Sequence, residues 1–140
     1  MFQLHPQLKA DTVLVGRFPL SLLLLSKDAN YPWCILVPQR AEVQEIYQLD
    51  NSDRQQLLQE SCVLAETLAK LFAADKINVA TIGNMVPQLH MHHVARFKSD
   101  VAWPRPIWGA VDASAYQEGM LARRVEELIS LLEPHGLVTS

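Results

Sequence analysis

Short apolar runs separated by turn-forming residues dominate the first 38 positions, and this pattern predicts β-strands. We expect strands at residues 13–17, 20–26 and 33–37, because these runs are rich in β-branched and aliphatic side chains. The segment between the second and third runs, Lys27-Asp28-Ala29-Asn30-Tyr31-Pro32, has the composition of a turn. The second and third strands should therefore form a hairpin, followed by a loop with a short helical turn.

A spacing of three and four residues between apolar positions then predicts a long helix, from residue 50 or 52 to about residue 74. The positions that share this spacing, and that we expect to face the core, are Leu58, Cys62, Ala65, Leu68, Ala69 and Phe72. A second helix is predicted at residues 114–132. Its apolar face contains Leu121, Val125, Leu128 and Leu132.

Two further strands are expected between the helices, at residues 77–82 and 89–97. The resulting order is three strands, a helix, two strands and a helix, which is typical of an α+β domain with a mostly antiparallel five-stranded sheet. No repeat, low-complexity tract or linker divides the sequence. We therefore predict a single domain over residues 1–140.

Composition and charge narrow the classes of function. Hydrophobic residues make up 49% of the chain and charged residues 19%, with a net charge of −3. Such a chain lacks the excess of Lys and Arg over Asp and Glu that is typical of nucleic-acid-binding proteins, although a small anion needs only a local binding site. The Leu22-Leu23-Leu24-Leu25 run is too short to span a bilayer. Two cysteines and no signal-peptide pattern favour the cytoplasm.

The candidate chemistry lies in the fifth predicted strand. Alternate residues of a strand project from the same face, so Gln88, His90 and His92 should lie together, with His93 on the other face. Imidazole binds metals, transfers protons near neutral pH and attacks phosphorus. This polar row is unusual in an apolar strand and is the principal functional candidate.

Local chemistry leaves three hypotheses for the histidines. They could be structural, or they could bind zinc, for which a His-x-His pair needs a third ligand that the run does not supply. His5 and His135 lie near the termini. The third hypothesis is nucleophilic catalysis at a phosphate. His90 would attack and His92 would stabilise the charge, while Gln88, Asn84 and the backbone of the Gly83 turn would supply further donors.

The segment 78–96 resembles the signature of the histidine triad (HIT) family of nucleotide hydrolases and transferases. That signature has an Asn in a strand, then Gly-Gln-x-Val-x and His-x-His-x-His. This chain has Asn78, followed by Gly83-Asn84-Met85-Val86-Pro87 and Gln88-Leu89-His90-Met91-His92-His93-Val94. The order of the elements is similar over residues 12–97, and the predicted C-terminal helix lies outside the resemblance.

The resemblance implies a role for each residue of the row. His90 matches the nucleophile that becomes nucleotidylated, and His92 matches the histidine that holds the phosphate and leaving group. Gln88 stands in place of the first histidine, whose backbone carbonyl orients the nucleophile, so a glutamine backbone can serve equally well. Asn84 replaces a phosphate-contacting Gln. Gly83 provides the preceding turn.

The resemblance also implies an activity and an assembly. We expect hydrolysis or transfer at a nucleoside phosphoramidate or dinucleoside polyphosphate through a nucleotidyl-histidine intermediate. The covalent step needs no metal, although magnesium can accompany a polyphosphate. A homodimer is expected because the family pairs its sheets and long helices. The alternative functions are a nucleotide-binding protein with little turnover and, less favoured, a histidine-based zinc module.

Several positions depart from the family pattern or lack a defined role. Ala41 stands where the family usually has a fourth histidine, which implies an altered pocket. The nucleoside-recognising position falls near residues 26–28. We expect a partly exposed His93 and a salt bridge at Arg96. Two tryptophans, Trp103 and Trp108, could stack on a base or pack in the core or a dimer interface. The sequence does not specify the base or the leaving group.

Overall fold

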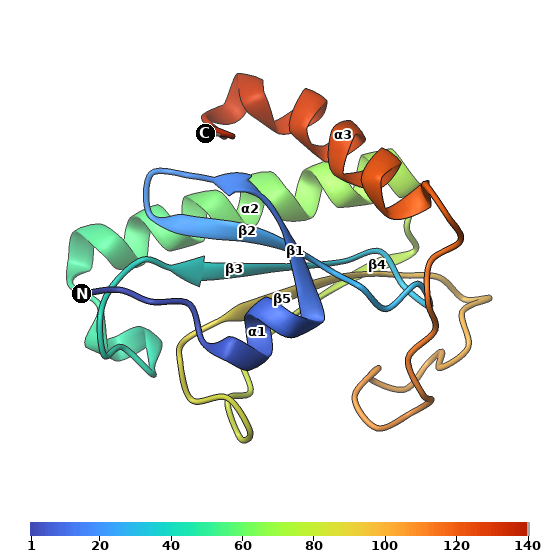
Figure 1. Ribbon diagram of the computed structural model, residues 1–140, viewed down its shortest axis with the longest axis horizontal. Coiled ribbons are helices and arrows are strands. Elements are labelled where there is room, and N and C mark those ends of the chain that lie inside the picture. Colours follow the sequence, from blue (N-terminus) through green and yellow to red (C-terminus); the bar gives the residue numbers. More distant parts are fainter. Residues whose placement is uncertain (140) are drawn as a thin grey trace.

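The computed structural model describes residues 1–139 and is built on one antiparallel sheet of five strands (Figure 1). The strands lie in the order β1-β2-β3-β5-β4. Their bounds are Thr12–Arg17 for β1, Ser21–Ser26 for β2, Trp33–Pro38 for β3, Lys76–Ala80 for β4 and Met91–Arg96 for β5. The predicted α+β class, the five strands and the hairpin between β2 and β3 are thereby confirmed.

Helices flank the sheet on both faces. The long helix α2 (Asn51–Phe72) and the C-terminal helix α3 (Met120–Leu132) lie on one side, and the short α1 (Pro6–Asp11) lies on the other (Figure 1). A 3₁₀ turn at Ile46–Gln48 provides the predicted helical turn after β3, and a second 3₁₀ turn, Glu133–His135, follows α3. The prediction missed α1. It also placed the start of α3 at residue 114, six residues too early.

The predicted core-facing stripe of α2 is wrong at Leu58 and Cys62 and is confirmed at Leu68. The buried positions of this helix are Leu57, Glu60, Ser61, Leu64 and Leu68. Leu58 is 65% exposed and Cys62 is also exposed. Polar residues concealed the true face: the buried Glu60 carboxylate accepts from the backbone N–H groups of Leu20 and Ser21, so its charge is compensated inside the core.

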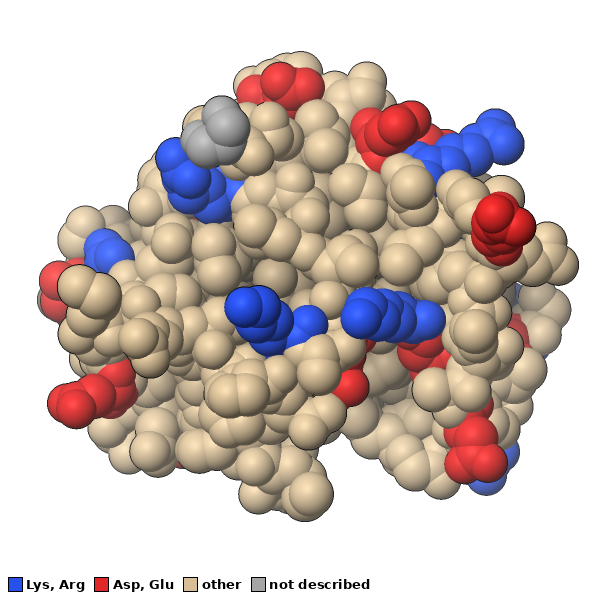
Figure 2. All heavy atoms as spheres, in the orientation of Figure 1, with Lys and Arg blue, Asp and Glu red and all other residues tan. Residues whose placement is uncertain are grey.

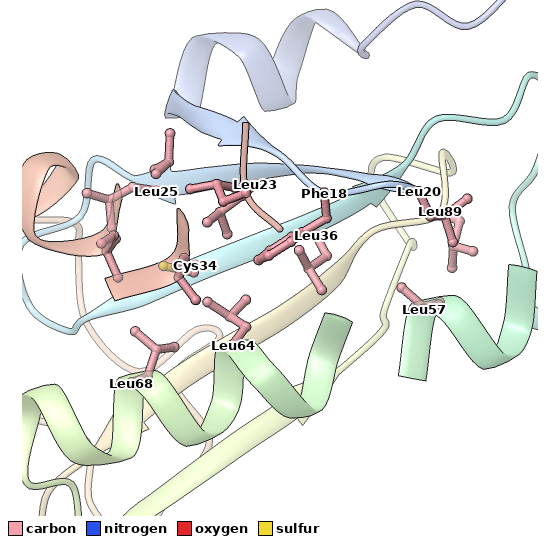
Figure 3. Packing of buried hydrophobic residues seen from close by; sticks show 14 of the residues in the cluster. Phe18, Leu20, Leu23, Leu25, Cys34, Leu36, Leu57, Leu64, Leu68 and Leu89 are labelled. Atoms are coloured by element: carbon pink, nitrogen blue, oxygen red, sulfur yellow. The ribbon is translucent and has the colours of Figure 1, made fainter. Parts of the chain in front are cut away.

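The main core lies between the sheet and the two longer helices. Side chains from one face of β2 and β3, among them Leu23, Leu25 and Leu36, pack against Leu64 and Leu68 of α2 (Figure 3). Because alternate strand residues point to opposite faces, a second cluster forms on the other face.

That second cluster places α1 next to the face that carries the histidines. Leu8 of α1 packs with Leu24 of β2 and Ile35 of β3. Ile35 is the register partner of His92 in β5. The face opposite α2 is therefore only partly covered, by α1 and by the loops that enter and leave β5, and this leaves room for a pocket.

Positive and negative side chains are scattered over the face of the molecule seen in Figure 2. On the face seen in Figure 2, residues 1–139 present separate Lys and Arg side chains interspersed with Asp and Glu, without a broad basic area. None of the helices within those residues has both the length and the apolar character needed to cross a membrane.

Candidate functional site

The two histidines of the row lie side by side where the β4–β5 loop meets β5. His90 immediately precedes β5 and His92 is its second residue. Their ring centroids are 4.9 Å apart and the ring planes are inclined at 75°. Both side chains are nearly buried, with 7% and 6% exposure. The prediction that these two imidazoles share a face is confirmed.

A backbone carbonyl fixes the tautomer of His90. Its Nδ1 atom lies 2.7 Å from the carbonyl oxygen of Gln88. A carbonyl oxygen only accepts, so Nδ1 donates the hydrogen bond, and in the neutral ring Nε2 keeps its lone pair. His90 therefore has the protonation pattern that a nucleophilic imidazole requires.

An indole fixes the opposite tautomer on His92. The Nε1–H group of Trp33 donates to Nδ1 of His92 over 3.0 Å, which leaves the proton of a neutral ring on Nε2. Trp108 packs edge-on against the same ring, with centroids 5.0 Å apart. Burial, followed by the proximity of His90 and His93, lowers the pKa of His92 to about 3, so the ring is neutral at physiological pH.

The Gln88 side chain turns away from the histidines and holds the N-terminal segment. Its Oε1 atom accepts from the backbone N–H of His5 over 2.9 Å, and its Nε2 atom donates to the carbonyl of Gln3 over 2.8 Å. Gln88, which the sequence resemblance aligns with the first histidine of the signature, thus contacts the site through its backbone. Its side chain supports the chain leading into α1.

A cavity of about 520 Å³ opens beside His90 and His92. Apolar walls come from Leu8 of α1, Ile35 of β3 and Val86 of the β4–β5 loop. Asn84 and Gly83 line it on the same loop, so the structure brings these two of the predicted phosphate-binding residues to the histidines. Gly83 has a φ of +74°, a left-handed conformation that glycine adopts without strain.

A second cavity of similar volume adjoins the first. Ser26, Lys27 and Asp28 line it, which brings the segment expected to recognise a nucleoside to the edge of the site. Trp33 and Trp108 line both cavities. The two spaces therefore meet at the tryptophans that contact His92.

The expected exposure of His93 is wrong. Its side chain is fully buried on the α2 face of the sheet. Its Nε2 lies 2.7 Å from Oγ of Ser61, and its Nδ1 lies 3.1 Å from the carbonyl of Met91. Burial lowers the pKa of His93 to about 4 despite the bond to Met91. His93 links α2 to β5 and lies outside the cavity.

The expected salt bridge at Arg96 is confirmed. Its Nε lies 2.8 Å from Oδ2 of Asp100, and both side chains are almost entirely buried. The guanidinium holds the pKa of Asp100 well below its usual range and lies over the ring of Trp103. Trp103 is thus a packing residue of this ion pair. Trp108 instead lines the cavity.

Two parts of the site were missed from the sequence. The sequence predicts Trp33 only as a strand residue, and it gives no indication that α1 lines the cavity. A tryptophan at the start of a strand does not by itself indicate a site residue, because its contact with His92 depends on the pairing of β3 with β5. Ala41, which the sequence resemblance aligns with a fourth histidine, is exposed in the loop after β3. Among residues 1–139, no group of three or more His, Cys, Asp or Glu side chains is arranged to hold a metal ion.

Comparison with known proteins finds a matching family model and several similar solved structures. The model of the HIT domain matches residues 7–99. A histidine triad protein from Marinobacter aquaeolei is 48% identical, with a TM-score of 0.93 over 96% of this chain and 98% of that chain. One from Bradyrhizobium japonicum is 44% identical, with a TM-score of 0.87 over 95% and 96% of the two chains. Among curated proteins, none matches the sequence.

Proposed function

Because the chain belongs to the HIT family, we propose that it is a hydrolase or transferase acting at the α-phosphorus of a nucleotide. The substrate would be a dinucleoside polyphosphate or a nucleoside phosphoramidate. The observation that carries this proposal is the 2.7 Å contact from Nδ1 of His90 to the Gln88 carbonyl. It leaves the Nε2 lone pair free in a ring that lines the cavity.

The proposed reaction has two displacements. In the first, Nε2 of His90 forms a bond to phosphorus while the bond to the leaving group breaks. His92 and Asn84, which line the same cavity, would donate hydrogen bonds to the phosphate oxygens as charge develops there. In the second, water or another acceptor attacks phosphorus and breaks the bond to His90. Hydrolysis releases the nucleoside monophosphate and restores the imidazole.

The walls of the cavity fit a nucleoside. Leu8, Ile35 and Val86 offer an apolar surface to a base, and Ser26 offers a hydroxyl to a sugar where the two cavities meet. This mixture of apolar walls and few polar groups is typical of small-molecule sites. No metal ligand is required for the proposed covalent step, and magnesium can accompany a polyphosphate substrate.

Trapping of the covalent intermediate tests the proposal. The protein is mixed with a panel of dinucleoside polyphosphates and adenosine phosphoramidates, and a nucleotidyl adduct is sought by mass spectrometry after an alkaline quench, because the P–N bond of a nucleotidyl-histidine hydrolyses in acid. We expect the adduct on His90, and we expect His90→Ala to abolish it and to lower kcat by about 10³-fold or more. His135→Ala is a matched control, because His135 is exposed at the far end of α3. Absence of both adduct and turnover across the panel would contradict the proposal.

A nucleotide-binding protein with little turnover is the second candidate. The observation that favours it is the Gln88 side chain, whose amide hydrogen-bonds to the backbone of His5 and Gln3 and so supplies no donor to a phosphate. Calorimetric binding of a nucleoside monophosphate without adduct or turnover would support this alternative over the enzyme.

We further propose a homodimer assembled through α2 and β4. The exposed stripe of α2 includes Leu58 and Cys62, and β4 is an edge strand of the sheet with Val79 48% exposed. Exposed apolar side chains on a helix, together with the edge strand of a sheet, are the kind of surface that a second copy can cover.

A further inference from the structure

We propose that Trp33 is a positioning residue that keeps His92 a neutral Nε2–H donor, and that the site is thereby suited to leaving groups that depart as anions. This inference rests on the proposed function and deepens it, because it distinguishes between the two substrate classes. Trp33 is the first residue of β3, the strand that pairs with β5.

The contact between Trp33 and His92 has only one consistent proton arrangement. An indole nitrogen donates and never accepts, so Nδ1 of His92 must offer its lone pair across the 3.0 Å contact. A second proton on the imidazole would occupy Nδ1 and face the indole N–H. Protonation of His92 therefore costs a hydrogen bond and creates a repulsion between two donors. The indole controls both the tautomer and the charge of the ring.

The other groups around His92 act in the same direction or are neutral. His90 and His93 belong to the same histidine run, and a positive charge on either disfavours one on His92. From β3 the ring meets Trp33 and its register partner Ile35. Trp108 approaches from the loop after β5. Asp11 of α1 also lines the cavity, but its side chain is exposed and accepts from Gln7.

Two adjacent imidazoles are thus held in complementary tautomers by different donors and acceptors. His90 donates a hydrogen bond from Nδ1–H to a carbonyl and presents a lone pair on Nε2. His92 accepts a hydrogen bond at Nδ1 from an indole N–H and presents a proton on Nε2. One ring can attack while the other donates a hydrogen bond to the phosphate. This division of roles needs no charged histidine.

The chemical consequence concerns the leaving group. When Nε2 of His90 bonds to the α-phosphorus of a polyphosphate, the bridging P–O bond breaks and its electron pair stays on the departing phosphate oxygen. That oxygen is stable as an anion, so no proton must move. When a phosphoramidate is cleaved, the electron pair remains on nitrogen, and this nitrogen must gain a proton. A neutral imidazole is a very weak acid and supplies hydrogen bonding only, as a neutral electrophilic histidine does in other enzymes.

Nitrogen-15 NMR of the ring atoms tests the proposal without any need for turnover. We expect His92 of the wild-type protein to show the Nε2–H tautomer and to stay neutral down to about pH 5. Trp33→Phe keeps an aromatic ring but removes the N–H, and we expect it to raise the pKa of His92 and to mix its tautomers. Trp108→Phe is the matched control. Trp108 also packs against the His92 ring, but in the described part of the chain, residues 1–139, its indole donates no hydrogen bond to His92.

Kinetics supply the second readout. We expect the wild-type protein to have a higher kcat/KM for dinucleoside polyphosphates than for phosphoramidates. At pH 5, Trp33→Phe should shift this ratio toward the phosphoramidate by about tenfold or more, because a protonated His92 could act as a general acid. Trp108→Phe should leave the pH dependence of the ratio unchanged.

The outcomes separate this inference from the proposed function. An Nδ1–H tautomer or a charged His92 above pH 5 in the wild-type protein would overturn the inference, even if Trp33→Phe did not fold. An unchanged His92 spectrum in a folded Trp33→Phe variant would also overturn it. The expected spectra without any adduct on His90 would support the positioning role of Trp33 while rejecting the proposed covalent activity.

Discussion

Ser61 of α2 donates a hydrogen bond to His93 of β5, with Oγ 2.7 Å from Nε2. The direction of the bond follows from the other nitrogen, because Nδ1 of His93 donates to the carbonyl of Met91. A polar side chain of the long helix is thereby satisfied inside the core, directly behind the strand that carries the site. The bond contributes to the placement of β5 against α2.

Removal of this hydroxyl should destabilise the fold. Ser61→Ala leaves the buried Nε2 of His93 without its donor, and we expect a loss of about 1–3 kcal/mol in the free energy of unfolding. Chemical denaturation followed by circular dichroism measures this loss. Ser130→Ala, on the exposed side of α3, serves as the control and should change stability little. A loss for Ser61→Ala no greater than that of the control would show that the bond is unimportant.

The buried histidines should make the fold sensitive to mild acid. The pKa values of His92 and His93 are lowered to about 3 and about 4 in the folded protein, against about 6.5 in an unfolded chain. The unfolded state therefore binds more protons below pH 6.5. Their contribution to stability is complete above that pH and is lost as the pH falls toward 4, by up to about 1.4 kcal/mol per pH unit for each histidine.

Unfolding midpoints measured between pH 4.5 and 7.5 check this slope. His93→Gln removes one of the two groups, so we expect it to reduce the pH dependence by about half, whatever its effect on absolute stability. His135→Gln, at an exposed position, should leave the slope unchanged. A wild-type protein whose stability is level from pH 7.5 to 4.5 would refute the assignment of neutral, buried imidazoles.

The sequence predicted those elements whose patterns are local. The alternation along residues 88–92 placed His90 and His92 on one face, and the five strands lie near their expected positions. The same reasoning failed for α2, because Leu57 and Leu58 are both apolar and the helix buries Glu60 and Ser61. Polar residues that find partners in the core cannot be recognised from hydrophobic spacing alone.

Contacts between segments that are far apart in the sequence determine the rest of the geometry of the site. The bonds from Gln88 to His5 and Gln3 join residues more than 80 positions apart, and the bond from Trp33 to His92 spans 59 positions. No local pattern encodes such pairs. The cytoplasmic location favoured by composition and by the free Cys34 and Cys62 stays a prediction.

Substitution of Gln88 should loosen the N-terminal segment while leaving the His90 tautomer intact. Gln88→Ala removes both side-chain bonds, to His5 and to Gln3, but keeps the backbone carbonyl that accepts from His90. We expect faster amide hydrogen exchange at residues 3–11. Because α1 lines the cavity, KM should rise by several-fold while kcat changes less.

Two comparisons sharpen this prediction. Gln59→Ala changes an exposed glutamine of α2 and should affect neither exchange nor KM. Gln88→Glu retains an acceptor for the His5 N–H but not the donor to Gln3, so an intermediate effect is expected. A collapse of kcat in Gln88→Ala with unchanged KM would instead place the Gln88 side chain in the chemical step.

The proposed homodimer predicts that a charged side chain on the exposed stripe of α2 dissociates the dimer into monomers. Leu58 of this stripe is 65% exposed, and burial of a carboxylate there against a second copy would be costly. We expect Leu58→Glu to weaken dimerisation by about 30-fold or more. Sedimentation equilibrium over a range of protein concentrations measures the change.

A matched substitution on α3 excludes a general effect of added charge. Leu131 is 43% exposed on that helix and does not belong to the exposed stripe of α2. Leu131→Glu should therefore leave the dissociation constant of the dimer unchanged. Val79→Lys on the edge strand β4 should weaken dimerisation as Leu58→Glu does, because both surfaces belong to the proposed interface. A wild-type protein that sediments as a monomer at about 100 µM, or a dimer that Leu131→Glu disrupts and Leu58→Glu does not, would show that the exposed stripe of α2 has another role.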